Sequence, residues 1–263
     1  MEKSLGRVHQ KSLFVDDVHL GYRRSLTPIK AGEALMLDPG YRLAHLPLVN
    51  PRHCDVIPHQ EGKTYDHGRH PPVTSLVLPV PQEALEASPA YQELQEALGK
   101  APLAEHIAWD LIQRRAGKLH ATLCGGLAGL SVEKEDKQSE IERIRKILSQ
   151  YPSFDVELRG VFSGNVNVGR LYMKLYPQLW QGKNPIQHIQ TALTERSSDL
   201  YLVGLHNLRD HLTLQQTAWL MEWIHHWWDR PILRFRVTHL WLLTSCDDLV
   251  LDSHKEACFD LAA

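Results

Sequence analysis

The sequence FDVELRGVFSGNVNVGRLYMKL (residues 154–175) contains the clearest indication of the fold. Apolar and polar residues alternate from Phe154 to Phe162 and again from Arg170 to Leu175, as they do in a strand that has one face on the core. Gly164-Asn165 lies between the two runs and is a plausible turn. The stretch therefore predicts a β-hairpin, and hairpins build antiparallel sheets.

Strand and helix patterns continue on both sides of this hairpin. Further strands are predicted at residues 73–80, 118–123, 201–205 and 235–243, and residues 247–252 form a short closing strand or a loop. Helices are predicted at about residues 85–98, 104–115, 137–150, 186–194 and 214–228. Paired strands interspersed with helices favour an α+β fold class, with mostly antiparallel sheets flanked by helices.

The first 72 residues differ from the rest of the chain. They contain scattered Gly, Pro and His, and their apolar residues seldom recur at helical spacing. We therefore expect residues 1–72 to be an N-terminal extension packed on a main domain formed by residues 73–263.

Composition excludes several classes of protein. With 263 residues, 43% of them hydrophobic and 23% charged, the chain can form a packed core and is not mainly disordered. A formal net charge of -2 gives no basic field for extended duplex DNA. No apolar run is long enough to span a bilayer, so no membrane partner is expected. The four cysteines form no CxxC pair and the N-terminus lacks a secretory signal, which indicates a cytoplasmic protein with reduced thiols. The phosphate-loop patterns GxGxxG and GxxxxGK[ST] are missing.

Two tetrapeptides carry the chemistry: HATL at residues 120–123 and HLTL at residues 211–214, 91 residues apart. In a strand, residues i and i+2 face the same side, so each histidine would project beside its threonine. An imidazole transfers protons near neutral pH, and a hydroxyl donates a hydrogen bond to a phosphate oxygen. We expect His120 and His211 to be a catalytic acid/base pair and Thr122 and Thr213 to bind the phosphate, with no metal and no cofactor.

This motif pair resembles that of the 2H phosphoesterase superfamily, which includes cyclic phosphodiesterases and 2'-5' RNA ligase-like proteins. The resemblance covers about residues 73–252 and implies two lobes with a central cleft between the histidines. It also implies a metal-independent phosphodiesterase that acts on a 2',3'-cyclic phosphate, or a related phosphodiester, of a nucleotide or short RNA. The expected partner is thus a small phosphodiester or a single-stranded RNA end.

The second motif leaves alternatives open. Thr213 and Gln216 also form a capping-box pattern, so a helix could begin there and leave His211 in a turn. His206 and His239 are other candidates, although leucine or tryptophan stands two residues after each. With a degenerate second motif, the chain would be a non-catalytic nucleotide- or RNA-binding module.

Two further clusters have structural interpretations. His53, Cys54, His59, His67 and His70 supply metal-ligand types, but their spacing matches no standard zinc site, and surface-loop histidines are the simpler interpretation. The extension that contains them could also cover the cleft. The tryptophans between residues 219 and 228 recur at helical spacing and are expected to pack in the core.

Overall fold

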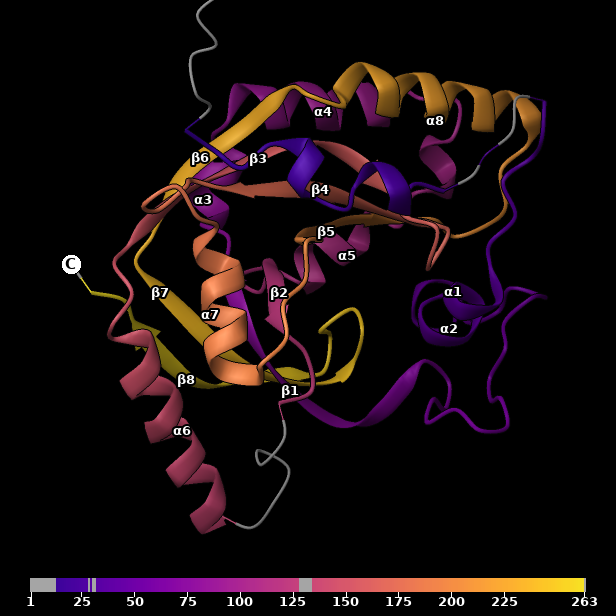
Figure 1. Cartoon of the computed structure of the whole chain (residues 1–263). Helices are drawn as coiled ribbons and strands as arrows, with labels where there is room; N and C mark the ends of the chain where they lie inside the picture. The colour runs from indigo at the N-terminus through magenta and orange to yellow at the C-terminus, as the bar shows by residue number, and fades with distance from the viewer. Residues whose placement is uncertain (1–12, 28, 30–31, 128–133, 263) are drawn as a thin grey trace, which may run out of the picture.

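The strands form one antiparallel sheet that curves through the molecule (Figure 1). The computed structural model describes residues 13–27, 29, 32–127 and 134–262; residues 1–12, 28 and 30–31 of the predicted extension lie outside this description. The strand order is β6-β3-β4-β5-β2-β1-β7-β8. The strands are β1 (Arg69–Pro79), β2 (His120–Cys124), β3 (Phe154–Ser163), β4 (Arg170–Pro177), β5 (Leu202–Asn207), β6 (Pro231–Val237), β7 (His239–Asp247) and β8 (Ser253–Asp260).

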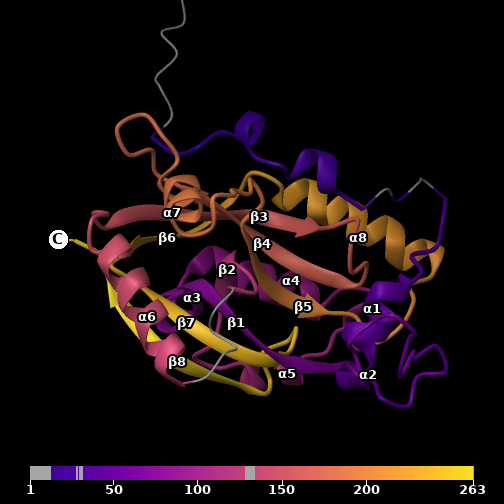
Figure 2. The ribbon, with the colours of Figure 1, turned by 60° about the horizontal axis from the view of Figure 1, so that its bottom comes forward.

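Helices flank this sheet on both sides, which confirms the α+β class. The longer helices α4 and α8 run beside the β6–β3 part of the sheet, and α6 and α7 lie beside β2 and β8 (Figures 1 and 2). The α-helices are α1 (Pro39–Ala44), α2 (Leu46–Val49), α3 (Gln82–Glu86), α4 (Pro89–Gly99), α5 (Asp110–Arg114), α6 (Lys134–Leu148), α7 (Pro185–Thr194) and α8 (Leu214–Trp227). The 3₁₀ turns are η1 (Asp17–His19), η2 (Arg23–Ser25) and η3 (Ala104–His106).

The predicted hairpin is present as β3 and β4, which pair from Val156↔Pro177 to Ser163↔Leu171. The predicted long strand at residues 235–243 is instead divided at Thr238 into β6 and β7. The reason is topological: β6 pairs with β3, whereas β7 pairs with β1 and β8 in the other part of the sheet. The chain therefore passes from one part of the sheet to the other at Thr238.

The predicted helix at residues 104–115 is also shorter than expected. Only η3 and α5 form there, because Ile107 has extended backbone and forms a β-bridge with Leu208. This bridge ties the connection between α4 and β2 to the end of β5.

The sheet consists of two four-stranded halves joined at one narrow place. The half β6-β3-β4-β5 meets the half β2-β1-β7-β8 only through β5 and β2, and their register is given by Ala121↔Val203. We call this contact the seam. The two halves correspond to the two lobes that the resemblance implied, and the seam is where one strand of each half pairs with the other.

A glycine allows α8 to pack closely on the sheet. Gly160 in β3 has a φ of 67°, which an L-side chain rarely adopts, and it sits at a register shift against β4. A Cβ atom there would overlap the carbonyl of Trp228 at the end of α8. The position therefore requires glycine for both reasons.

The described part of the extension is joined to the main domain by backbone contacts. Leu26 and Leu35 form bridges with Gly164 and Leu212, and the hydroxyl of Tyr22 lies 2.7 Å from the carbonyl oxygen of Leu175. In Figure 2 this segment runs beside α8 and continues to α1 and α2. Strand β1 begins at Arg69, so the extension leads directly into the sheet.

Candidate active site

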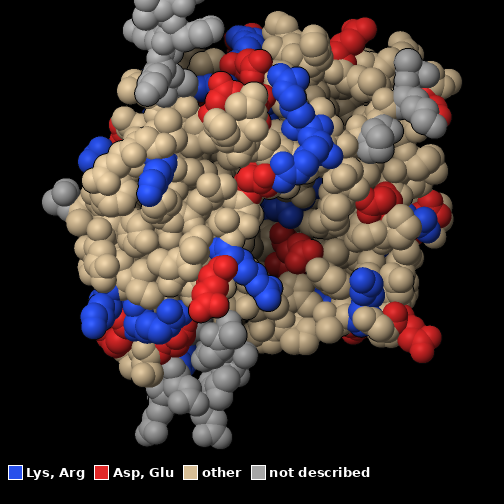
Figure 3. All heavy atoms as spheres, viewed as in Figure 1, with Lys and Arg blue, Asp and Glu red and all other residues tan. Residues whose placement is uncertain are grey.

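A cavity of about 690 Å³ lies between the two halves of the sheet. Its walls come from β1, β2, β4, β5 and β7 and from the loops around Tyr65 and Asp248. Figure 3 shows basic and acidic side chains around a hollow near the middle of this face. Both His120 and Thr122 line the cavity, whereas neither His211 nor Thr213 does.

His120 begins β2 and is held in one tautomer. Its Nδ1 lies 2.7 Å from the carbonyl oxygen of Lys118. A carbonyl only accepts, so Nδ1 carries the proton and Nε2 keeps its lone pair. Burial lowers the pKa of His120 to about 4, with the charges of Arg170 and Arg115 adding to the effect and the Lys118 hydrogen bond opposing it. The ring is therefore neutral near pH 7 and can accept a proton.

Thr122 lies on the same face of β2 as His120, two residues further along. It is exposed, and no described residue forms a hydrogen bond with its hydroxyl. That hydroxyl is free to donate to an anion in the cavity. The sequence motif at residues 120–123 thus places a proton acceptor and a hydrogen-bond donor on one wall.

Sequence reasoning did not identify the arginines of this cavity. Arg115 follows α5 and is only 2% exposed, yet it lines the cavity together with Arg170 from the start of β4. The Arg115 Nη2 donates to the carbonyl of Leu205 over 2.8 Å, and the Arg170 Nη1 donates to the carbonyl of Asp248 over 3.0 Å. A single arginine in a helix or strand has no distinctive pattern, so only the fold brings these two together.

A second histidine lines the cavity, but its protons are already engaged. His70 Nδ1 donates to the carbonyl of Pro71 over 2.7 Å, and its Nε2 lies 3.4 Å from Asp248 Oδ1. The hydroxyl of Tyr65 donates to the other oxygen of Asp248 over 2.8 Å. The hydrogen bond to Asp248 raises the pKa of His70, which burial alone would lower. Both ring nitrogens of His70 therefore face oxygen acceptors, and the ring is a partner of Asp248.

The structure does not bring His211 and Thr213 to His120, and the predicted pairing needs correction. Thr213 is the N-cap of α8, where its Oγ1 accepts from Gln216 N and the Gln216 side chain accepts from Thr213 N. This capping box starts a helix at once, so the strand geometry that would align His211 with Thr213 is lost. His211 Nδ1 accepts from Leu37 N, and its Nε2 lies 2.6 Å from Asp55 Oδ2.

Strand β5, not residues 211–214, faces β2 across the seam. The Ala121↔Val203 register places Gly204 opposite His120 and Leu202 opposite Thr122, and both line the cavity. Neither side chain can transfer a proton. The second wall of the cavity therefore has no imidazole–hydroxyl couple.

The other candidate histidines do not fill this position. His206 is buried next to Trp109, and its Nε2 lies 2.9 Å from Gln95 Oε1. Burial lowers its pKa to about 3. His206 and His239 are both outside the residues that line the cavity.

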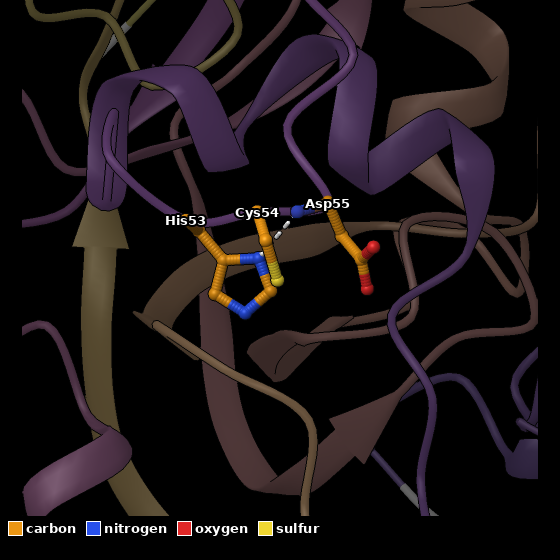
Figure 4. A group of neighbouring side chains, drawn as sticks. All are labelled: His53, Cys54 and Asp55. Carbon is orange, nitrogen blue, oxygen red and sulfur yellow. Dashed lines mark hydrogen bonds between the residues drawn. The ribbon is translucent and has the colours of Figure 1, made fainter.

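Two overlapping groups of metal-ligand types involve the extension, and the second also includes residues of the loop before α8. They are His53 with Cys54 and Asp55, and His53 with Asp210 and His211, each with ligand atoms within 4.8 Å of one another. Figure 4 shows the first group, with the backbone N–H of Asp55 directed at Nδ1 of His53 over 3.0 Å.

Hydrogen bonds disfavour a metal in these groups. Because Nδ1 of His53 and Nδ1 of His211 both accept backbone N–H groups, each neutral ring carries its proton on Nε2. Those Nε2 atoms face Asp210 and Asp55. A metal would need the same nitrogens without their protons. We call these two His–Asp pairs the clasp, because they join the extension to the loop before α8.

The fold and the cavity define an α+β protein with an anion-attracting site between two half-sheets. The model of the 2'-5' RNA ligase superfamily matches residues 113–248, just over half of the chain. The chain therefore belongs to this superfamily, and the resemblance noted in the sequence is confirmed.

Solved structures with a similar course of the chain include Escherichia coli LigT in complex with NADP+ (14% identity, TM-score 0.44, 72% of this chain and 98% of that chain). Another is a phosphoesterase (13% identity, TM-score 0.43, 74% of this chain and 100% of that chain). A third is the protein TT0787 of Thermus thermophilus (11% identity, TM-score 0.42, 72% of this chain and 97% of that chain). No curated protein matches the sequence closely enough to be called a relative. Within the described residues, no helix combines the length and apolar character needed to cross a bilayer.

Proposed function

We propose that this protein hydrolyses a phosphodiester of a nucleotide or short RNA end, such as a 2',3'-cyclic phosphate, without a metal. Membership of the 2'-5' RNA ligase superfamily supports enzyme activity on phosphodiesters. The observation that carries the proposal is the fixed tautomer of His120, whose Nε2 keeps its lone pair at a cavity that also contains Thr122, Arg115 and Arg170.

In the proposed reaction, Nε2 of His120 takes a proton from a water molecule as the water oxygen bonds to phosphorus. The Thr122 hydroxyl holds a non-bridging oxygen, where negative charge increases in the transition state. The bond from phosphorus to one ribose oxygen breaks, which leaves a phosphomonoester. The ribose oxygen takes its proton from solvent, since β5 supplies no histidine opposite His120.

The test is hydrolysis of adenosine 2',3'-cyclic phosphate in excess EDTA by the parent protein and by His120→Ala and His211→Ala. We expect turnover by the parent and by His211→Ala, and loss of turnover in His120→Ala. His254→Ala is a matched control, because His254 lies on the edge strand β8 and its side chain is 67% exposed. Activity in His120→Ala equal to that of the parent would contradict the proposal.

A second function is favoured by one observation. Leu202 and Gly204 stand where a second couple would face His120, so the protein could retain phosphate binding without turnover. Binding of the cyclic nucleotide by the parent, with no product formed, would select this binding module over the enzyme.

A further inference from the structure

Arg115 and Arg170 are two like charges that share the cavity without a carboxylate partner. Among the described residues, neither forms an ion pair with Asp or Glu within 4.0 Å, and the buried Nε of Arg170 has no hydrogen-bond partner. Burial, followed by the charge of Arg170, lowers the pKa of Arg115 to about 10, so the Arg115 guanidinium stays charged near pH 7. The charge of Arg170 acts on Arg115, and two like charges in one cavity repel each other unless an anion lies between them.

The carboxylates of the cavity bind other groups, although the charge of Arg170 also acts on Asp248. Asp247 accepts the backbone N–H groups of Leu249, Leu251 and Asp252. Asp248 accepts from Tyr65 and faces His70. A third cation, Lys118, also lines the cavity, and its Nζ lies near backbone carbonyl oxygens. The cavity therefore has more positive charge than its own acidic residues neutralise.

Gly204 creates the room that Arg170 occupies. A Cβ atom on residue 204 would lie 3.1 Å from both Cζ and Nε of Arg170 and closer still to Nη2. The guanidinium therefore lies against the backbone of β5, at the position opposite His120. Strand β5 has no histidine–hydroxyl pair that faces the cavity, and the guanidinium of Arg170 packs against it instead.

We propose that Arg115 and Arg170 form a clamp for a second phosphate group of the substrate, next to the phosphodiester at His120. The inference rests on the function proposed above and narrows its substrate class. A nucleoside 2',3'-cyclic phosphate carries one negative charge at the phosphate and would leave a buried guanidinium unpaired. An RNA end or a nucleotide with an additional phosphate neutralises both, and charge-assisted hydrogen bonds from arginine to phosphate are among the strongest available.

The experiment compares two ligands that differ by one phosphate: adenosine 2',3'-cyclic phosphate and its 5'-phosphorylated form. Affinities are measured by titration calorimetry in EDTA with His120→Ala protein, which prevents turnover. We expect the 5'-phosphorylated ligand to bind about tenfold more tightly or better. Adding Arg170→Gln should reduce this preference to about twofold or less.

Two further variants separate a binding role from a folding role. Gly204→Ala retains every charge but displaces the guanidinium, and it should also reduce the preference for the second phosphate. Arg196→Gln removes an arginine from an exposed loop and should retain the full preference. Thermal melting identifies any variant that has lost its fold.

Equal affinity for the two ligands would overturn the clamp, as would a full preference in folded Arg170→Gln protein. The test does not depend on catalysis. A parent protein that prefers the second phosphate but forms no product would retain the clamp while the hydrolytic function fails.

Discussion

Strands β2 and β5 are antiparallel neighbours at the seam, yet their cavity-facing residues have different chemistry. Strand β2 presents His120 and Thr122, whereas β5 presents Gly204 and Leu202 at the opposing positions. The first strand can move a proton and donate a hydrogen bond. The second makes room for the charge of Arg170. The comparison teaches that the two walls of one site can have different roles. One wall can carry the group that transfers a proton, and the other can hold a positive charge.

The largest effect is expected from His120 itself. His120→Ala should lower kcat for a cyclic phosphodiester by about 10²–10⁴-fold, the usual contribution of a positioned general base. Steady-state kinetics in EDTA measure the loss. A decrease in kcat of less than about threefold would show that another group transfers the proton. Strands β2 and β5 would then not differ in this role.

The two positions facing each other across the seam allow a matched pair of substitutions. Thr122→Val removes a hydroxyl while retaining the shape of the side chain, and it should lower kcat about 10–100-fold because one hydrogen bond to the transition state is lost. Leu202→Val on the opposite strand should change kcat by about twofold or less. Equal losses in the two variants would show that β5 contributes as much as β2.

The pH profile of kcat/KM tests the environment of His120. Because its folded-state pKa is lowered to about 4, the ring should stay neutral from pH 7.5 down to pH 5, and the rate should change by about twofold or less. A histidine of ordinary pKa would lose about 30-fold over the same range. A fall in rate centred near pH 6.5 would contradict the buried, arginine-flanked position.

The same burial predicts acid lability of the fold. His120 and His206 remain neutral in the folded protein below the pH at which unfolded histidines take up protons. The unfolded state therefore binds more protons, and stability is lost as the pH falls from about 6.5 toward 4. Each of the two should contribute a slope of roughly 1.4 kcal/mol per pH unit in that window, measured by denaturant unfolding. His206→Gln should flatten the slope, and an unchanged slope would contradict the assignment.

The smallest effect is expected at the clasp, far from the seam. Asp55→Asn removes the charge that faces His211 and should lower the Tm only slightly, with turnover unchanged. Added Zn²⁺ should not raise Tm, because the facing nitrogens of His53 and His211 carry protons. A Tm increase of several degrees with Zn²⁺ would show that these residues form a metal site.

The sequence predicted those parts of the fold whose pattern is local. The alternation in residues 154–175 was sufficient for β3 and β4, and the capping residues marked the start of α8. Strand β8 was missed, since it is an edge strand in which only Phe259 is fully buried and alternation is weak. The break between β6 and β7 was missed because it depends on which strand each one pairs with.

The candidate site was predicted on one wall only. His120 and Thr122 line the cavity because the motif coincides with a strand. The second HxTL pattern has the same residue types at the same spacing. Gln216 forms a capping box with Thr213, so helix α8 begins there instead of a strand. Only the register Ala121↔Val203 shows which residues oppose His120, and no local pattern encodes that register. The pairing of Arg115 with Arg170 depends on tertiary structure in the same way.

The position of β1 in the sheet has a consequence for any shortened form of this protein. The residues that match the superfamily begin at 113, but β1 ends at Pro79 and lies between β2 and β7 in the strand order. A polypeptide cut to residues 113–248 would therefore lack the strand between β2 and β7. The backbone N–H and C=O groups of β2 and β7 that pair with β1 would then have no partner. Such a fragment would expose unpaired strand edges, and we expect it to self-associate.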